Sequence, residues 1–404
     1  MNITSTIIQN IRSRCNTNIS NQVYMDYNAT TYLRKEILEI PNILSHYPLN
    51  PSSIHSYGMN ARNLLEDARK RIINVLNIDS SIYDLVFTSS GTESNNTVLS
   101  SFITHPILIS STEHLSTYVY QKNSTSIHTV QVDTRGLVDL NNLSYTLKKI
   151  FNFDATYQDI NPILISTAYA NSETGVITNV NEINEYLRLQ RYKDKVVLHI
   201  DCVQAIGKIF VDIKSLDLDY CTISSHKIGG PLGIAILIFK KRHQHQLKPM
   251  MVGGGQEKGI RSGTENVVGA VQLSYALEIA ISETQRYYNY TKALRDVLED
   301  RLKDKAIIVS QKSDRLPNTT LIIMPGVDSQ TQLMFFDMQG FAVSNGSACS
   351  SGKTSPSHVL TAMGYNDELS QCAIRVSLGM LNTENQIHRF ASTWLDLYDS
   401  YHSS

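Results

Sequence analysis

The sequence has few cysteines, almost no net charge and no long apolar run. Its five cysteines are Cys15, Cys202, Cys221, Cys349 and Cys372, and no two of them are spaced as CxxC. An odd number without that spacing argues against a disulfide framework and a zinc site, so we expect no metal and a reducing compartment. No apolar run approaches the ~18 residues that a membrane helix needs. A net charge of −1 over 404 residues gives no electrostatic footprint for direct binding of nucleic acid or an anionic membrane.

Acidic residues are missing from the N-terminal segment 1–22, which carries Arg12 and Arg14. Mitochondrial transit peptides share that bias, but two arginines are thin support, and a packed or disordered extension explains the same pattern. We therefore expect a cytoplasmic protein, with a mitochondrial or other organellar location as the alternative.

Short β-rich apolar runs alternate with segments of helical period between about residues 60 and 290. The expected strands are 85–88, 107–110, 163–167, 196–200, 220–224 and 234–239. The expected helices are 60–76, 93–102, 140–150 and 180–190. Such alternation predicts an α/β domain with a mainly parallel sheet.

The pattern changes near residue 285, where a long helical stretch, 283–305, precedes mixed elements and a helical C-terminus. We predict an N-terminal extension over 1–22, a large domain over 36–285 and a small domain built from 23–35 and 286–404. In open α/β sheets, ligands bind at the carboxyl ends of the strands. The residues just after each strand are therefore the functional candidates.

Three strand ends carry polar residues that say little when taken singly. Gly91 and Thr92 form a small-residue turn at a helix start, which suits an anion but equally suits an ordinary helix cap. His114 follows the second strand, and Asn171 and Ser172 follow the third. A hydrogen-bonded loop accounts for these residues without any ligand.

Asp201 and Lys227 are more informative. Asp201 ends an apolar strand, where an unpaired carboxylate is costly, so it needs a cation; a protonated heterocycle nitrogen or a structural salt bridge would serve. Lys227 ends a strand beside Ser224, Ser225 and His226 and precedes two glycines. A desolvated lysine there would act as a Schiff-base nucleophile, whereas a solvated loop lysine is the alternative.

The last candidates lie in loops and near the C-terminus. The glycine-rich stretch 253–266 contains Arg261 and Thr264, which suits either an anion or a plain connection. Cys349 stands in a run of Ser and Gly, whereas structural cysteines are usually buried among apolar residues, so it is a candidate nucleophile. Arg375 has a guanidinium that can grip a carboxylate or simply face solvent.

Several motifs stand in register along the chain: YMDYNATT at 24–31, NPSSIH at 50–55, SGTE at 90–93, HID at 199–201, SSHK at 224–227, GGGQE at 253–257, RSGTEN at 261–266 and GSAC at 346–349. Together they resemble the NifS/IscS-like cysteine desulfurases of the class V aminotransferase family, over about residues 23–381. The resemblance implies the aspartate-aminotransferase fold (fold type I) with pyridoxal 5'-phosphate (PLP), in which a large domain with a mainly parallel seven-stranded-type sheet carries a smaller α+β domain.

The resemblance also implies roles for single residues. Lys227 would bind the cofactor covalently and move protons, Asp201 would pair with the ring nitrogen, Gln204 would donate to the phenolic oxygen and His114 would stack on the ring. The remaining cofactor contacts would be Gly91, Thr92, Ser172, Ser224, Ser225, His226 and, from a partner subunit, Thr264. Arg375 and Asn171 would bind the substrate.

The implied reaction removes sulfur from L-cysteine, gives L-alanine and leaves a persulfide on Cys349, with Lys227 and His114 as the other catalytic residues. GSACSSG is similar to the group with a long cysteine loop, which passes sulfur to iron–sulfur cluster assembly or tRNA thiolation. A homodimer and a sulfur-acceptor protein are the implied partners.

Two departures leave questions open. Ser172 stands where the family has a second asparagine, and the chain ends soon after its final helix, without the tail that docks the iron–sulfur scaffold in bacterial members. A related PLP lyase or aminotransferase, and a diverged PLP fold that acts as a binding or regulatory partner, are therefore the alternatives.

Overall fold

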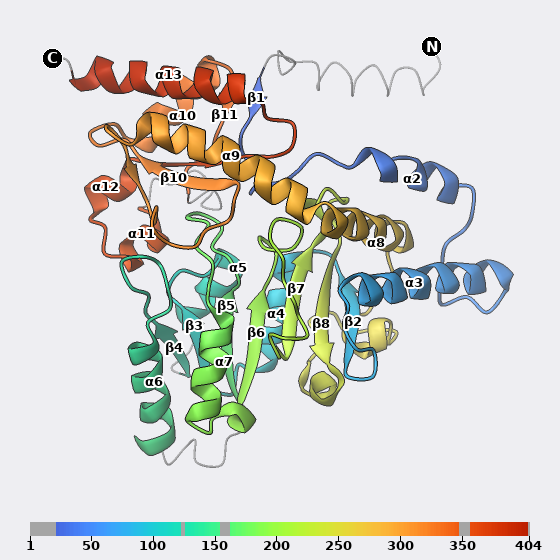
Figure 1. Cartoon of the computed structure of the whole chain (residues 1–404). Coiled ribbons are helices and arrows are strands. Elements are labelled where there is room, and N and C mark those ends of the chain that lie inside the picture. Colours follow the sequence, from blue (N-terminus) through green and yellow to red (C-terminus); the bar gives the residue numbers. More distant parts are fainter. Residues whose placement is uncertain (1–21, 123–125, 154–161, 347–355, 403–404) are drawn as a thin grey trace, which may run out of the picture.

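The computed structural model describes residues 22–122, 126–153, 162–346 and 356–402. A large sheet with helices on both faces makes up one part of the molecule, and a smaller α+β part lies across one end of that sheet (Figure 1). The architecture predicted from the alternation of strands and helices is confirmed.

The large sheet has seven strands in the order β2-β8-β7-β6-β5-β3-β4. Only β8 runs antiparallel to its neighbours among these strands, so the sheet is mainly parallel. The strands are β2 (Tyr83–Thr88), β3 (Ile107–Ser110), β4 (Ile127–Val130), β5 (Ile163–Ala168), β6 (Val196–Asp201), β7 (Tyr220–Ser224) and β8 (Ala235–Lys240).

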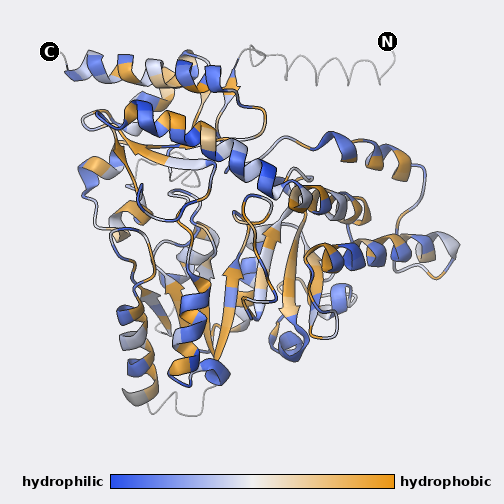
Figure 2. Ribbon diagram, in the orientation of Figure 1, coloured by the Kyte–Doolittle hydropathy of each residue, from blue (hydrophilic) through white to orange (hydrophobic). Residues whose placement is uncertain are grey.

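Alternating side chains of these strands enter separate cores on the two faces of the sheet. Leu85 and Phe87 belong to one core and Val86 to the other, as the two-residue period of a strand requires. The first core is closed by α3 (Ser56–Val75), α6 (Leu140–Phe153), α7 (Val180–Leu189) and α8 (Val267–Ser282), and the second by α4 (Gly91–Ser101). Figure 2 shows the apolar strands enclosed between helices whose outer sides are polar.

The smaller part contains the antiparallel sheet β12-β10-β9 and the parallel pair β1-β11. Its core joins Val23 and Met25 to Leu298, Phe336 and Trp394. Its elements are β1 (Val23–Tyr24), α9 (Thr284–Leu302), β9 (Ile307–Ile308), β10 (Thr319–Ile323), α10 (Ser329–Met338), β11 (Phe341–Ala342), α11 (His358–Ala362), α12 (Asp367–Gln371), β12 (Ala373–Ser377) and α13 (Glu384–His402). The predicted domain boundaries stay a prediction, although this core does combine the segment near residue 23 with residues after 290.

The remaining elements are short. They are α2 (Glu39–Leu44), α5 (Leu115–Tyr118) and the 3-10 helices η2 (Lys35–Ile37), η3 (Val119–Lys122), η5 (Lys193–Lys195), η6 (Ser225–Lys227), η7 (Lys241–Gln246) and η8 (Glu257–Gly259). Of the helices in the described parts of the chain, none has the length and apolarity to cross a membrane.

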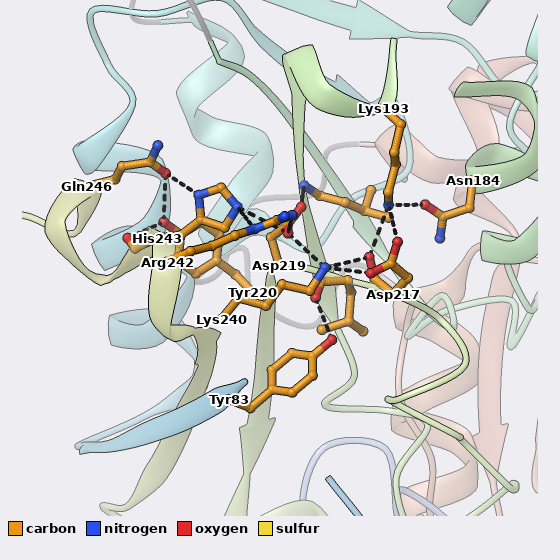
Figure 3. A network of polar contacts seen from close by, with 12 residues as sticks. Tyr83, Asn184, Lys193, Asp217, Asp219, Tyr220, Lys240, Arg242, His243 and Gln246 are labelled. Atoms are coloured by element: carbon orange, nitrogen blue, oxygen red, sulfur yellow. Dashed lines mark hydrogen bonds and ion pairs between the residues drawn. The ribbon is translucent and has the colours of Figure 1, made fainter. Parts of the chain in front are cut away.

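A charged network fixes the end of the sheet where β7 begins and β8 finishes (Figure 3). Its centre is Asp219, which is 1% exposed and accepts from the Leu198 N–H at 2.9 Å and from Lys240 Nζ at 3.0 Å. Burial alone would raise the pKa of Asp219, but the hydrogen bond from His243 and the charge of Lys240 hold it well below its usual value. The network therefore joins β6, β7 and β8 at the end of the sheet where β7 begins, which is opposite the end where Asp201 and Ser224 lie.

Candidate active site

A cavity of about 320 Å³ opens where the carboxyl ends of β2, β3, β5, β6 and β7 meet below the smaller part of the molecule. This volume lies within the range of about 300–1,000 Å³ that is typical of small-molecule sites. Most of the residues singled out from the sequence line it: Gly91, Thr92, His114, Asn171, Ser172, Asp201, Gln204, Ser224, His226 and Lys227. The structure thus brings these residues together, whereas their individual roles stay predictions.

Asp201, the last residue of β6, is a buried carboxylate on the cavity wall. Its Oδ2 accepts from Asn95 Nδ2 at 2.7 Å and its Oδ1 from the Val203 N–H at 2.9 Å. Within the described chain it forms no ion pair with lysine or arginine. A cation that enters the cavity would therefore meet a carboxylate that is already oriented for it.

Asn95 and Ser116 also line the cavity and were missed by sequence reasoning. Asn95 Nδ2 donates to Ser116 Oγ at 2.9 Å, and Ser116 Oγ lies 2.8 Å from His114 Nδ1. A polar chain therefore links Asp201 to His114. The available signal was a run of polar residues, 94–97, inside a helix that packs on the sheet.

His114 starts the short helix α5, and its Nδ1 accepts from the Ser116 N–H at 3.1 Å. Burial lowers the pKa of His114; the carboxylate of Asp201 opposes that shift, and the charge of Lys227 reinforces it. The ring is therefore neutral near pH 7 and can take up a proton.

Lys227 reaches the cavity from η6, directly after β7. Its Nζ donates to the Ala29 carbonyl at 2.7 Å and to the Asn28 carbonyl. Both acceptors belong to the segment that follows β1, so a residue of the large sheet contacts the chain that enters the smaller part. The amine is thus fixed between the two parts of the molecule.

The N-terminus of α4 forms the anion-binding end of the cavity. Ser90 caps the helix by accepting from the Glu93 N–H, which leaves the Gly91 and Thr92 N–H groups without a partner in the described chain. A side chain at Gly91 would lie 3.1 Å from Val203 Cγ2, so glycine keeps this surface open. Free N–H groups and the helix dipole favour a bound phosphate here.

His226 stands beside this helix end, and its Nδ1 lies 3.2 Å from Thr30 Oγ1. Burial, followed by the charges of Lys227 and Lys208, lowers the pKa of His226 to about 4. The ring is therefore neutral near pH 7 and would contact an anion as a hydrogen-bond donor rather than as a cation.

The chain is similar to known proteins over nearly its whole length. Residues 23–390 match the family model "Aminotransferase class-V". The chain is 34% identical over 380 residues to "Cysteine desulfurase IscS 1" of Archaeoglobus fulgidus, covering 91% of this chain and 94% of that one. It is 35% identical over 383 residues to "Cysteine desulfurase IscS" of Dictyoglomus turgidum, with 91% and 92% covered. The solved structure of a NifS-like protein from Rickettsia africae superposes with a TM-score of 0.84 at 39% identity, covering 94% of this chain and 99% of that one.

The chain belongs to the class V aminotransferases, among the cysteine desulfurases. The predicted family, and with it the PLP fold of type I, is confirmed.

Cysteine desulfurases depend on PLP, and the cavity fits that cofactor on its own evidence. Asp201 is a buried carboxylate without a lysine or arginine partner among the described residues, so a protonated ring nitrogen could serve as its cation. Lys227 supplies an amine in the same cavity, and the open surface at Gly91 with its free N–H groups suits the phosphate. Asp201 would pair with the ring nitrogen, Lys227 would bind the aldehyde carbon, and the N–H groups at Gly91 would hold the phosphate.

The residues predicted to bind substrate are already engaged within this desulfurase. Arg375 pairs with Asp26 at 2.6 Å and donates to the Ser172 carbonyl at 3.1 Å, but its buried Nε has no partner among the described residues. Asn171 donates to the Thr112 carbonyl, and its Oδ1 accepts from the N–H groups of the following turn. Arg375 Nε is thus a buried donor without a partner among the described residues, while Asn171 mainly fixes the turn.

Three described residues among those predicted, Arg375, Ser225 and Thr264, do not line the cavity. Ser225 is fully buried, and a side chain at Gly230 would collide with its Oγ, so the geometry does not support a cofactor contact for Ser225. Thr264 is exposed in its loop, and its predicted reach into a partner subunit stays a prediction. Cys349 lies outside the described residues.

The described residues on either side of Cys349 meet at one carboxylate. Ser357 Oγ donates to Glu173 Oε2 at 2.6 Å, and a side chain at Gly346 would lie 2.5 Å from the same oxygen. Glu173 is itself buried and follows two cavity residues, Asn171 and Ser172. The segment that carries Cys349 therefore starts and ends next to the cavity.

The described cysteines are poor candidates for sulfur chemistry. Cys202, Cys221 and Cys372 are buried. A hydrogen bond with Cys221 and then burial raise the pKa of Cys202, and burial raises that of Cys372. Thiolates are therefore disfavoured at Cys202 and Cys372. The part of the chain that the structure describes also holds no cluster of acidic, histidine or cysteine side chains suited to a metal ion.

Proposed function

We propose that this chain is an active desulfurase that takes sulfur from free L-cysteine, with PLP on Lys227 and the sulfur received by Cys349. The convergence of Asp201, His114 and Lys227 on one cavity, beside a helix N-terminus that suits phosphate, carries this proposal. PLP, when bound, supplies an electron sink that eases bond breaking at the substrate Cα and Cβ.

Asp201 maintains that electron sink, because a buried carboxylate favours a protonated ring nitrogen. Gln204 lies on the same wall with its Nε2 donating to the Asn28 carbonyl at 3.0 Å, close to Lys227. It would donate to the phenolic oxygen of the ring. These two residues orient the cofactor and set its charge.

The substrate carboxylate would bind Arg375 through the Nε that has no partner in the described chain. The ion pair with Asp26 holds the guanidinium plane in place for that contact. Ser172, which replaces the usual asparagine, contributes its carbonyl to Arg375 and to Asn28 Nδ2, so this position supports the arginine through its backbone.

Lys227 and His114, which both line the cavity, would carry the protons of the reaction. The amine of Lys227 would take the proton from the substrate Cα. His114, neutral near pH 7 because burial lowers its pKa, can accept or return a proton on the side facing Asp201. The polar chain through Ser116 and Asn95 keeps the ring of His114 in a fixed orientation.

Cys349 would complete the reaction as a thiolate. Its sulfur attacks the substrate sulfur, an S–S bond forms, and the Cβ–S bond breaks with its electron pair going to carbon. Protonation of that carbon gives alanine and leaves the sulfur on Cys349 as a persulfide. The burial of Cys202, Cys221 and Cys372 supports this assignment, because none of these three is positioned to meet substrate.

The persulfide sulfur would pass to an acceptor protein for iron–sulfur cluster assembly or tRNA thiolation. A homodimer, as in related desulfurases, would place the exposed Thr264 of one subunit near the phosphate of the other. A lyase or aminotransferase would use the same cavity without Cys349. A regulatory partner would use neither the cavity nor Cys349. Measuring the products formed from L-cysteine separates the desulfurase from these two alternatives.

The test incubates the purified protein with PLP, L-cysteine and a thiol reductant and measures alanine and sulfide. We expect both products from wild type, neither from Lys227→Ala, and at least a hundred-fold loss in Cys349→Ala, since the sulfur acceptor is missing. Cys15→Ala is the matched control and should retain wild-type rates. Undiminished products from Cys349→Ala would contradict the persulfide step, and no cofactor binding by wild type would leave only the regulatory alternative.

A further inference from the structure

Lys208 is a buried lysine next to the cavity that the proposed mechanism does not use. It is 2% exposed and lies in the turn after β6. Its Nζ donates to Gln204 Oε1 at 2.6 Å and to Asn28 Oδ1 at 2.7 Å. It forms no ion pair with any carboxylate in the described chain. A lysine buried without an ion pair destabilises the fold, so a functional reason is expected.

Neighbouring charges increase the free energy needed to bury Lys208. Burial lowers the pKa of Lys208 most, the positive charges of Lys227 on η6 and Arg375 on β12 lower it further, and Asp26 after β1 opposes them. Gln204 and Asn28, which are neutral amides, are the only acceptors that the described residues offer its Nζ. As an ammonium or as an amine, Nζ can donate to both oxygens.

That donation fixes which way the Gln204 amide points. A lysine ammonium only donates, so the amide oxygen Oε1 must face Lys208 and the NH₂ group must point away from it. The Nε2 donor then lies toward the Asn28 carbonyl, the same acceptor that Lys227 Nζ contacts. Lys208 and the Asn28 carbonyl thus hold the amide from its two ends, and removing Lys208 would leave Oε1 without its donor.

Lys208 also fixes the Asn28 side chain from the other end. Asn28 Oδ1 accepts from Lys208, while its Nδ2 donates to Thr319 Oγ1 at 2.9 Å and to the Ser172 carbonyl at 3.1 Å. Asn28 therefore cannot rotate to take the place of Lys208 beside Gln204. The arrangement has one orientation that satisfies every group in it.

We propose that Lys208 is a positioning residue that holds Gln204 with its N–H donor presented toward the group bound at Lys227. The inference rests on the proposed function, in which that group is PLP and the acceptor is its phenolic oxygen. Lys208 itself does not line the cavity, so it acts through Gln204.

The experiment follows the visible absorbance of bound PLP against pH and measures the affinity of the apoprotein for PLP. A hydrogen bond to the phenolic oxygen stabilises its charged form, so losing that bond should raise the pH midpoint. For Lys208→Met we expect a midpoint about one pH unit higher and PLP binding about ten-fold weaker, the size of one hydrogen bond. Lys208→Arg, which keeps the donors, should restore most of both quantities. Lys214→Met, at an exposed lysine between β6 and β7, is the matched control and should match wild type.

A double-mutant cycle separates positioning from charge and packing. If Lys208 acts through Gln204, Lys208→Met should add almost nothing to the midpoint shift already caused by Gln204→Met. Equal shifts with and without Gln204, or no shift in Lys208→Met, would overturn the inference. If Lys208→Met does not fold, Lys208→Leu, which also lacks a donor, replaces it in the same cycle. Failure of wild type to bind PLP would instead contradict the proposed function.

Discussion

Glu113 is a buried carboxyl with one satisfied oxygen. Its Oε1 accepts from the Ala168 N–H at 2.8 Å, whereas Oε2 has no partner among the described residues. Burial raises the pKa of Glu113 to about 8; the Ala168 N–H opposes the shift, and the carboxylate of Asp201 adds to it. Glu113 is therefore mostly protonated near pH 7, whereas its neighbour Asp201 must stay charged to pair with a cation.

This shift predicts a pH-dependent stability difference. Between the usual value of 4.5 and about 8, the folded state binds the proton more tightly than the unfolded state, so stability falls as pH rises. Glu113→Gln removes the titration, so we expect its urea midpoint relative to wild type to rise between pH 5 and 8. The change should be at most about 1.4 kcal/mol per pH unit for one proton. A constant difference across that window would show that Glu113 is charged in the folded state.

Single residues differed in how far the sequence could reveal them. Asp201 and Lys227 were identifiable because the first ends an apolar strand and the second follows one closely, and such strand ends share one edge of the sheet. Glu113, Asn95 and Lys208 were missed because their importance lies in partners that are far away in sequence, such as Asp201 for Asn95 and Asn28 for Lys208. The direction of an amide and the absence of a counter-ion cannot be read from local pattern.

At the scale of elements, α3 is attached to the rest of the large part by a buried ion pair. Arg69 Nη2 lies 2.9 Å from Glu257 Oε1 of η8, with side-chain exposures of 6% and 2%. Glu257 Oε2 also accepts from the Phe87 N–H of β2 at 2.7 Å. One carboxylate thus joins a helix, a strand and the glycine-rich loop.

Removing one partner of this pair should be strongly destabilising. We expect Arg69→Met to lower the free energy of unfolding by about 3–5 kcal/mol, because it leaves Glu257 buried without a counter-ion. Arg71→Met is the control on the same helix: its pair with Glu278 is partly exposed and should contribute about 1 kcal/mol or less. Chemical unfolding of the three proteins gives the comparison. A similar loss in both variants would mean that burial does not decide the strength of these pairs.

Most central strands could be predicted because they are continuous apolar runs bounded by polar turns. The expected strand 107–110 is β3, and 220–224 is β7. By contrast, β4 was missed, since it is a short, half-buried edge strand. Helix α8 was not singled out either, because it is apolar on nearly all sides and shows no 3.6-residue stripe. Periodicity identifies elements with one buried face better than those with two or none.

At the scale of the whole molecule, the Asp219 network should govern stability toward acid (Figure 3). The folded pKa of Asp219 lies below its ordinary value of 3.8, so its contribution is complete above pH 4 to 5 and is lost as pH falls further. We expect Asp219→Asn to cost about 1–3 kcal/mol at pH 7, since the buried Lys240 loses this carboxylate and keeps only its pair with Asp217.

That difference should shrink as the pH falls below about 4, because the Asp219 carboxylate is then protonated in unfolded wild type while it stays charged in the folded state. Denaturant midpoints measured from pH 3 to 7 give the comparison. Asp300→Asn, which alters an exposed pair with Lys303, should stay within about 0.5 kcal/mol at every pH. A gap that stays constant down to pH 3 would show that hydrogen bonding rather than charge holds the network.

The two-part arrangement was predictable only in outline from composition and pattern. The resemblance in sequence motifs placed residues near 23 with the C-terminal part, and the pairing of β1 with β11 shows such a contact. No local signal announces that pairing, because β1 is two residues long and its partner lies more than 300 residues away. Long-range parallel pairing is a property of the folded chain.

Glu173 holds together the two described residues that flank the segment with Cys349. Ser357 Oγ donates to its carboxylate and Gly346 lies close to the same oxygen, so any chain between these two described residues must close between two fixed points. The entropy of closing such a loop changes by only about 0.6 kcal/mol when its length doubles. The reach of the cysteine can therefore be lengthened or shortened by insertion or deletion with little effect on folding. The segment between Gly346 and Ser357 could therefore be exchanged for one of another length without changing the rest of the fold.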